Sequence, residues 1–293
     1  MTYNLKDFRF TVFGDKVTKE EILVDTSVNA LGGSDKIKGT STTNAAAGLE
    51  IRQTGTLDAS NGDDLIWGAS SVAYNHNSPP VDLHGIGILV SGQIYTGFGD
   101  DTIKGEVASE SSEPTYNRGI YVQSGGVIDT GFGNDNVTGL SGPNGYGIYN
   151  ESGGLIQTGS GRDRVTGNGG RGYGIYNDGL IDTGADDDVL SATAAGKGTD
   201  FTGNGQANLG PGNDKVEGFG SGYFDGGVGK DRLLFRTAGT YSISSAATNG
   251  YYAVTLSTSD DPATTMYVKN FELIGAVGGG TQAFTPGGSF TIS

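Results

Sequence analysis

One nine-residue motif near the C-terminal end limits the fold of this chain more than any other feature. The motif, Gly226-Gly-Val-Gly-Lys-Asp-Arg-Leu-Leu234, has the form G-G-x-G-x-D-x-U-x, in which U is an aliphatic residue. Its glycines allow a tight turn, and its aliphatic residue starts a strand directly after the turn. Repeats of this form stack as parallel β-coils whose turn carbonyls and Asp carboxylates suit a calcium ion. The motif therefore predicts a β-solenoid with calcium sites at its turns.

Degraded copies of the motif recur along most of the chain. In each copy an Asp is followed two residues later by Ile, Val or Leu, and successive aspartates lie 29, 37, 34, 28, 25, 26 and 17 residues apart. This spacing gives one turn for each coil, and the alternation of a strand points the aliphatic residue inward. The aspartates are Asp35, Asp64, Asp101, Asp135, Asp163, Asp188, Asp214 and Asp231.

Two further segments repeat between these turns. A Gly-Ile-Tyr segment begins at Gly119, Gly147 and Gly174, and an apolar-x-Thr-Gly segment precedes each middle turn, as at Ile94 to Gly97. With the strand after the Asp, each coil contains three strands. We therefore expect an all-β, right-handed parallel β-helix of about eight coils.

The repeat also suggests the domain organisation. Residues 1–30 lie before the first turn and are expected to form an N-terminal cap, and residues 31–235 form the parallel β-helix with its G-x-G-x-D turns. Residues 236–293 lose the repeat but keep alternating apolar residues, which predicts a C-terminal β cap. Caps are needed because the unpaired strands at the ends of a solenoid favour end-to-end association.

Composition agrees with this fold and excludes several classes of protein. Glycine accounts for 54 of 293 residues, as expected for many turns with positive φ. The chain has no cysteine, so it has neither disulfides nor thiolate metal sites, and no apolar run approaches the length of a membrane span. A net charge of -15 without a cluster of Lys and Arg disfavours nucleic acid as a partner.

The repeated turns resemble those of the RTX proteins, the hemolysin-type calcium-binding repeat proteins of bacteria. The resemblance is loose from Leu31 and close from Leu209 to Phe235. It implies calcium between successive turns and an extracellular protein exported by a type I channel, with a secretion signal within Gly288 to Ser293. The ligands it implies are Asp64, Gly97, Gly99, Asp101, Gly131, Gly133, Asp135, Asp188, Gly210, Gly212, Asp214, Gly227, Gly229 and Asp231.

A metal-free reading of the same turns stays open. Asp163 lies between Arg162 and Arg164, and Lys and Arg residues also neighbour several other turn aspartates. In this reading, the bases and the hydrogen bonds of the Asx turns would neutralise an Asp ladder. In the calcium reading, two neighbouring coils must share each ion, because Ca²⁺ needs about 6 to 8 oxygens and one turn offers only about three.

Columns of Thr, Asn and Tyr are expected along the coils. Threonine precedes the turn glycine at Thr96, Thr130, Thr158 and Thr183, and the alternation predicts that these side chains point inward. An internal hydroxyl ladder is thus favoured over the ranked threonines of an ice-binding face, which is our third functional hypothesis. Asn150 and Asn177 are likewise expected to stack inside a corner.

Tyr121, Tyr149 and Tyr176 each follow an inward isoleucine and are therefore expected to face solvent one above another. Such a strip combines apolar area with polar hydroxyl groups, which suits a polysaccharide, a protein partner or a second copy of the chain. The alternative is that the long loops cover it. The favoured function is thus a calcium-binding, extracellular structural or adhesive solenoid, or one that recognises glycans.

Catalysis is the main alternative from another class, because polysaccharide lyases and epimerases also use parallel β-helices. His76 and His84 are the two histidines of the chain, and Tyr74 lies near them in the longest interruption of the repeat. General acid-base catalysis needs a positioned group with a tuned pKa. These three residues are the candidates for such a role in a carbohydrate-active or other small-molecule enzyme, and Tyr74 and His84 could form a Tyr-His-Arg set with Arg118.

Overall fold

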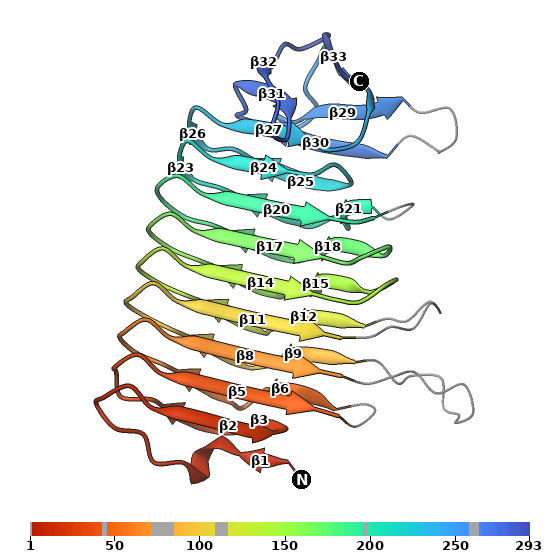
Figure 1. The fold of residues 1–293 in the computed structure, drawn as a ribbon. Helices are drawn as coiled ribbons and strands as arrows, with labels where there is room; N and C mark the ends of the chain where they lie inside the picture. Colours follow the sequence, from red (N-terminus) through yellow and green to blue (C-terminus); the bar gives the residue numbers. More distant parts are fainter. Residues whose placement is uncertain (1, 43–45, 72–84, 109–116, 196–198, 258–263) are drawn as a thin grey trace, which may run out of the picture.

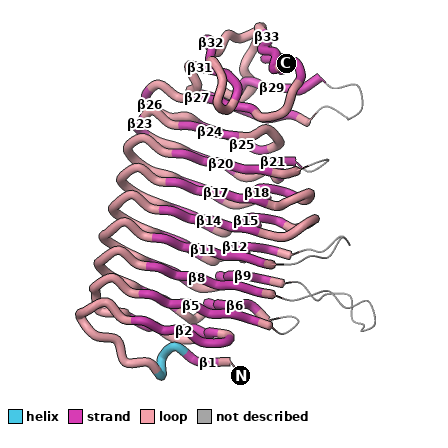
Figure 2. Tube along the Cα trace, viewed as in Figure 1, coloured by secondary structure: helices cyan, strands magenta, loops and turns pink. Residues whose placement is uncertain are grey.

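The computed structural model describes residues 2–42, 46–71, 85–108, 117–195, 199–257 and 264–293. These residues form an elongated stack of β-coils, with the N-terminus at one end and the C-terminus at the other (Figure 1). Nearly all the regular structure in this part of the chain is strand, apart from one 3-10 turn, η1 (Leu5–Asp7) (Figure 2). The expected all-β parallel solenoid is confirmed.

Three long sheets run along the stack, and each coil from β2 to β22 contributes one strand to each of them. Within a sheet, identical positions of the repeat pair directly, as Ile94 does with Ile128 and Ile128 with Ile156. Sheet A has eight strands among the described residues, which agrees with about eight coils. Its strands are β1 (Tyr3–Asn4), β3 (Ile22–Val24), β6 (Ala47–Ile51), β9 (Ile86–Val90), β12 (Arg118–Val122), β15 (Tyr146–Asn150), β18 (Tyr173–Asn177) and β21 (Thr199–Thr202).

Sheet B follows the Asp turns and lies in front in Figure 1. Its strands pair in parallel up to β31, and β32 adds an antiparallel strand at the C-terminal end. They are β2 (Lys16–Glu20), β5 (Lys36–Ser41), β8 (Leu65–Ser70), β11 (Thr102–Val107), β14 (Asn136–Leu140), β17 (Arg164–Asn168), β20 (Val189–Thr193), β24 (Lys215–Glu217), β27 (Arg232–Phe235), β31 (Leu273–Ala276) and β32 (Thr281–Ala283).

Sheet C precedes the Asp turns and ends in the antiparallel strands of the C-terminal segment. Between sheets C and B, the turns themselves pair through the short strands β23 (Pro211–Gly212) and β26 (Val228–Gly229). The strands of sheet C are β4 (Ser27–Asn29), β7 (Thr56–Asp58), β10 (Gln93–Tyr95), β13 (Val127–Asp129), β16 (Leu155–Gln157), β19 (Leu180–Asp182), β22 (Gln206–Asn208), β25 (Gly222–Asp225), β30 (Thr265–Lys269), β29 (Tyr252–Ser257), β28 (Gly239–Ile243) and β33 (Ser289–Ile292).

The core consists of columns of aliphatic side chains, because every strand points alternate residues inward. The residue two positions after each turn Asp is buried, as Ile103, Val137 and Val165 are. These residues pair in register across neighbouring coils. Burial of such continuous apolar columns is the main stabilising contribution to a solenoid.

The boundaries of the caps differ from those expected. Residues 16–29 contribute β2, β3 and β4 to the three sheets, so they form the first coil rather than part of a cap. The cap at this end consists of β1, η1 and the buried Phe10. At the other end, β30 and β31 continue sheets C and B in parallel, while β28, β29 and β33 add antiparallel strands.

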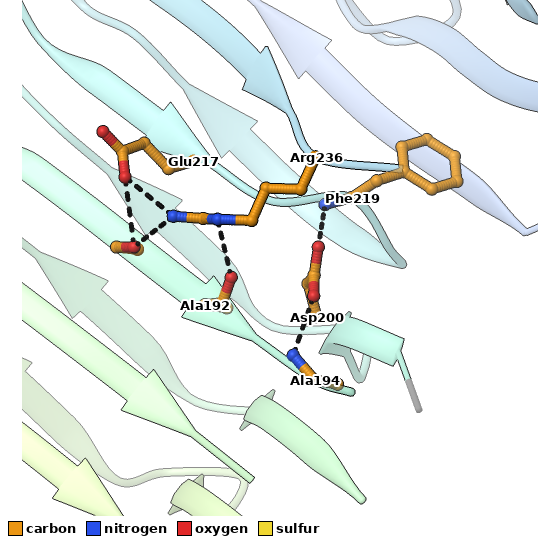
Figure 3. Close-up of polar contacts among 7 residues, drawn as sticks. Ala192, Ala194, Asp200, Glu217, Phe219 and Arg236 are labelled. Atoms are coloured by element: carbon orange, nitrogen blue, oxygen red, sulfur yellow. Dashed lines mark hydrogen bonds and ion pairs between the residues drawn. The ribbon is translucent and has the colours of Figure 1, made fainter. Parts of the chain in front are cut away.

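Partly buried polar contacts lie where sheet A ends at β21 (Figure 3). Arg236 Nη2 donates to Glu217 Oε2 at 2.8 Å, and its Nη1 donates to the carbonyl of Ala192 at 3.0 Å. The Asp200 carboxylate accepts the backbone N–H groups of Ala194 and Phe219. These side chains bind backbone groups that a further strand of a regular coil would otherwise satisfy.

No helix in the described segments is long and apolar enough to cross a membrane.

Candidate cation site

The turn aspartates form one internal column where sheet C turns into sheet B. Their exposed fractions are 2% or less. The backbone N–H of each except Asp231 donates to Oδ1 of the aspartate in the next coil, as from Asp101 to Asp135 and from Asp135 to Asp163, both at 2.8 Å. We call these residues the aspartate column: Asp35, Asp64, Asp101, Asp135, Asp163, Asp188, Asp214 and Asp231.

Both ends of the aspartate column are closed by acidic residues that the sequence motif did not reveal. At the N-terminal end, the N–H of Asp15 donates to Asp35 Oδ1, and Asp15 Oδ2 accepts the N–H of Thr11. At the C-terminal end, Glu272 Oε2 accepts the N–H of Asp231 at 2.8 Å. The signal that could have found Asp15 and Glu272 is an acid two residues before a buried aliphatic residue, here Val17 and Ile274.

The second carboxylate oxygen of every residue in the aspartate column has no hydrogen-bond partner in the described part of the structure. These Oδ2 atoms are buried, and none of the column residues forms an ion pair with a described base. Eight stacked carboxylates therefore lack a visible counter-charge. Because an unpaired buried charge is costly, the column must take up protons or cations.

Burial raises the pKa of the column carboxyls above that of a free Asp. The pKa of Asp188 is raised to about 8, and that of Asp163 to about 7. Desolvation is the largest cause, and repulsion from neighbouring column members adds to it. At neutral pH, protons and metal ions would therefore compete for the same oxygens.

The predicted threonine column lies beside the aspartate column. Thr96, Thr130, Thr158 and Thr183 are fully buried, and each hydroxyl donates to a backbone carbonyl of the next coil, as Thr130 Oγ1 does to Thr158 at 3.1 Å. The same hydroxyls lie next to the column carboxyls of their own coils and lower their pKa, as Thr130 does for Asp135. The inward orientation is confirmed in the structure.

Glycines allow the turns to stack closely. Gly97 and Gly133 have φ values of 92° and 135°, and a Cβ on Gly133 would lie 1.7 Å from the carbonyl oxygen of Gly99. Gly131, Gly210, Gly227 and Gly229 have the same relation to the preceding coil. Some turn carbonyls also accept N–H groups of the next coil, as Gly97 does from Phe132. Only glycine fits these positions.

The column offers oxygen ligands, which suit a hard cation, but neighbouring coils would have to share each ion. No group of three or more Asp, Glu, His or Cys side chains that could hold a metal ion occurs in the described ranges. Each coil offers one free carboxylate oxygen, and the four middle coils add a neighbouring threonine hydroxyl oxygen. Parallel strands lie about 4.8 Å apart, which is roughly twice a Ca²⁺–O distance of about 2.4 Å. Two coils would therefore have to share an ion, and turn carbonyls or water would complete its shell.

The metal-free reading expected bases and local Asx-turn hydrogen bonds at each turn. In the structure, each Oδ1 instead accepts the N–H of a residue one coil away, and the column has no described base beside its carboxylates. Arg162 and Arg164 are exposed and form no ion pair with Asp163, which has the same partners as every other column residue. Asp163 and Asp35 therefore belong with Asp64, Asp101, Asp135, Asp188, Asp214 and Asp231 as candidate ligands.

At another corner, between sheets A and C, Asn150 and Asn177 stack inside the coil as expected. Asn150 Nδ2 donates to Asn177 Oδ1 at 2.8 Å, and Asn177 Nδ2 donates to the carbonyl of Gln206.

The predicted tyrosine strip lies on the outer face of sheet A, but its rings contact one another rather than standing free. Tyr149 stacks on Tyr176 with centroids 4.4 Å apart, and Tyr121 packs edge-on against Tyr149. The Arg118 guanidinium lies over Tyr121 and Tyr149 at 4.4 and 4.7 Å. Tyr146 joins the cluster by stacking on Tyr173 of the next coil. These half-buried tyrosines form a compact aromatic cluster.

An open polar groove adjoins this cluster at the corner that follows sheet A. The hydroxyl of Tyr121 donates to Glu151 at its edge, and Ser91 donates to Gln123 within it. The groove is lined by Glu50, Arg52, Gln53, Thr54, Ser91, Gln123, Ser124 and Glu151.

The candidate catalytic residues His76, His84 and Tyr74 lie outside the described residues.

Comparison of the chain with models of known protein families, with curated proteins and with solved structures found no match. The function must therefore be inferred from the geometry of the chain itself.

Proposed function

We propose that the protein is an extracellular structural solenoid stabilised by calcium ions in the aspartate column. The observation that carries the proposal is the row of eight buried Oδ2 atoms without partners. The resemblance of the turns to RTX repeats supports both the choice of ion and the extracellular site, where calcium is available.

The energetic argument rests on the sign of the charge in the column. A carboxylate that is buried without a counter-charge destabilises the folded state, and each further anion in the stack adds repulsion. A bound divalent cation would remove this penalty for two neighbouring carboxylates. Because the unfolded chain cannot bring two coils together, binding would be coupled to folding.

The proposed ligands are the column carboxylates, with the hydroxyl oxygens of Thr96, Thr130, Thr158 and Thr183 nearby. When bound, calcium would supply only charge and coordination, without redox chemistry. The hydrogen bonds from each backbone N–H to Oδ1 hold the carboxylates in position before any ion arrives.

Calcium titration of chelator-treated protein tests the proposal. We expect heat of binding, release of protons near pH 7 and a higher melting temperature, with Mg²⁺ much weaker because it requires a tighter octahedral shell. Asp163→Asn should weaken binding. Asp187→Asn is the matched control, because Asp187 is an exposed Asp beside the same column. The absence of both binding heat and a melting shift in millimolar calcium would refute the proposal.

A second candidate function is glycan recognition by the tyrosine cluster. It is favoured by the position of that cluster beside a groove with Gln, Glu, Arg and hydroxyl side chains, which match the donors and acceptors of a sugar. A glycan array tests it. Tyr149→Ala should reduce binding, whereas Tyr223→Ala, in the separate stacked pair with Tyr267, should not. Array binding that is equal for both variants would exclude this site.

A further inference from the structure

The outer face of sheet B collects bases in a chain that is otherwise strongly acidic. Its strands point seven of the chain's 18 Lys and Arg side chains outward, but only three of its 33 acids. We call this surface the basic face. Its bases are Lys16, Lys36, Lys38, Lys104, Arg164, Lys215 and Arg232, and its acids are Glu20, Glu106 and Glu217.

The neighbouring face of the solenoid has the opposite charge. The parallel strands of sheet C point Asp58, Asp129, Asp182 and Asp225 outward, with Lys269 as the one described base among them. That lysine is paired with Asp225 at 2.9 Å. The fold therefore gathers bases on the outer face of sheet B and acids on the outer face of sheet C, although the chain as a whole is acidic.

The bases of the basic face are mostly not neutralised by the protein. Among the described residues, Lys104 pairs with Glu106 at 2.6 Å, and the other six bases form no ion pair. A chain with nearly twice as many acids as bases could readily have paired them. Their field is instead directed at solvent, where it would attract anions.

An aromatic ring lies among the lysines. Trp67 sits between Lys38 and Lys104 in consecutive coils, with the Lys38 ammonium 3.3 Å and the Lys104 ammonium 4.9 Å from the ring centroid. Cation-π contacts of this kind hold both ammonium groups over the ring. Lys36 lies two residues from Lys38 on the same strand and is exposed.

We propose that the basic face binds an acidic polysaccharide. Such a polymer repeats its anionic groups along a line. The bases of the basic face are spread along the solenoid axis on β2, β5, β11, β17, β24 and β27, with β8, β14 and β20 carrying none, on the sheet that lies in front in Figure 1. A flat face suits an extended chain, and Trp67 offers apolar surface to a sugar ring. The inference does not depend on calcium in the aspartate column or on the tyrosine cluster.

The intrinsic fluorescence of Trp67 reports directly on this surface, because it is the only tryptophan of the chain. Titration with polygalacturonate oligomers in the presence of chelator should change this fluorescence. The apparent affinity should fall at least tenfold between low and high salt, because charge contacts at an exposed surface are screened. Neutral dextran should produce no change.

The matched variants separate local charge from net charge. The triple variant Lys36→Gln, Lys38→Gln, Lys104→Gln should bind at least tenfold more weakly. The control Arg9→Gln, Arg171→Gln, Lys230→Gln removes the same charge from exposed positions elsewhere and should bind like the parent. The single variant Lys36→Gln, at an exposed position, tests the face with least risk to folding and should weaken binding measurably.

Equal binding by both triple variants would overturn the proposal. So would a preference for phosphatidylglycerol vesicles, for duplex DNA or for a second copy of the chain, measured by flotation, competition and sedimentation. Calcium-dependent stabilisation measured on the same samples would be unaffected by any of these results, so failure of this inference is distinguishable from failure of the calcium proposal.

Discussion

Two columns of polar side chains that occupy corners of this solenoid differ in how their buried polar atoms obtain hydrogen-bond partners. Asn150 and Asn177 stack at the corner between sheets A and C, and the aspartate column stacks at the corner between sheets C and B. In the asparagine column, each Nδ2 has an acceptor in the next coil, and among the described residues only the neutral Asn150 Oδ1 is left without a partner. In the aspartate column, one oxygen of every carboxylate has no partner among the described residues.

The difference follows from the chemistry of the two side chains. An amide carries a donor and an acceptor, so it can pass hydrogen bonds from coil to coil without any added species. An ionised carboxylate carries acceptors only, so its column takes backbone N–H groups on one side and has nothing to donate on the other. A column of aspartates therefore requires protons or cations, whereas a column of asparagines does not.

The pH dependence of stability should separate the two columns with the largest effect. The folded-state pKa values of about 6 for Asp35, Asp135 and Asp214 and about 8 for Asp188 exceed the unfolded value of 3.8. The folded state therefore binds more protons than the unfolded state between these limits. Without calcium, the free energy of unfolding should fall by several kcal/mol from pH 4 to pH 8, since each pKa unit corresponds to about 1.4 kcal/mol.

Urea unfolding of chelated protein at several pH values measures this slope. Below about pH 4 the trend should reverse, because hydrogen bonds lower the pKa of the exposed Asp100 and Asp187, and their stabilisation is lost as they protonate. Saturating calcium should remove most of the loss at pH 8. A chelated protein that is equally stable at pH 5 and pH 8 would show that the column is already neutralised by another route.

A glycine substitution tests whether the aspartate column depends on the close stacking of its turns. Gly133→Ala places a Cβ 1.7 Å from the Gly99 carbonyl oxygen at φ 135°, and we expect a loss of about 3 kcal/mol from backbone strain and displacement of the turn. Gly125→Ala is the control. It has φ 82° but meets nothing within 4 Å, so it should cost about 1 kcal/mol.

Thermal and chemical denaturation would measure both variants. Gly133→Ala should also abolish calcium binding at the neighbouring coils, because their carboxylates would no longer be in register. The contribution of these coils to the calcium-dependent rise in melting temperature would then be lost. Equal losses for the two glycine variants would show that the turn can relax without disturbing the column.

Converting one column into the other is the next test. Asn177→Asp removes the donor to the Gln206 carbonyl and introduces a buried acid, so we expect a loss of about 2 kcal/mol at pH 8 and a smaller loss at pH 4, where the acid is protonated. Asn168→Asp changes an exposed residue whose side-chain oxygen accepts the N–H of Gly170, a bond that Asp can keep, and should alter stability little. A pH-independent loss for Asn177→Asp would contradict the comparison.

The sequence predicted the parts of this molecule that a local pattern determines. The spacing from Asp135 to Val137 and from Thr130 to Gly131 fixes which side chains face inward, so the aspartate, threonine and asparagine columns could all be foreseen. Asp15 and Glu272 were missed because neither follows a G-x-G turn. The cap boundary at residue 30 was wrong because β2 to β4 lack the repeat but still pair in register.

Surfaces that arise only from stacking could not be predicted. Lys38 and Lys104 are 66 residues apart in sequence, yet both contact Trp67 because their coils are neighbours of its coil. The sequence thus suggested the absence of any cluster of bases, whereas the fold creates one. The packing of Arg118 against the tyrosines was likewise hidden, because the coil lengths that bring them together vary.

The smallest effect should come from the threonine column, which lies beside the aspartate column. Thr130 donates to the Thr158 carbonyl and lowers the pKa of Asp135. Thr130→Val keeps the shape but removes the hydroxyl, so we expect a loss of about 1 kcal/mol at pH 5. The loss should grow towards pH 8, because Asp135 ionises there and would lack the hydroxyl that stabilises its charge. An equal loss at both pH values would mean that the threonines support only the backbone, and that the carboxylates rely on their own N–H contacts and on bound cations.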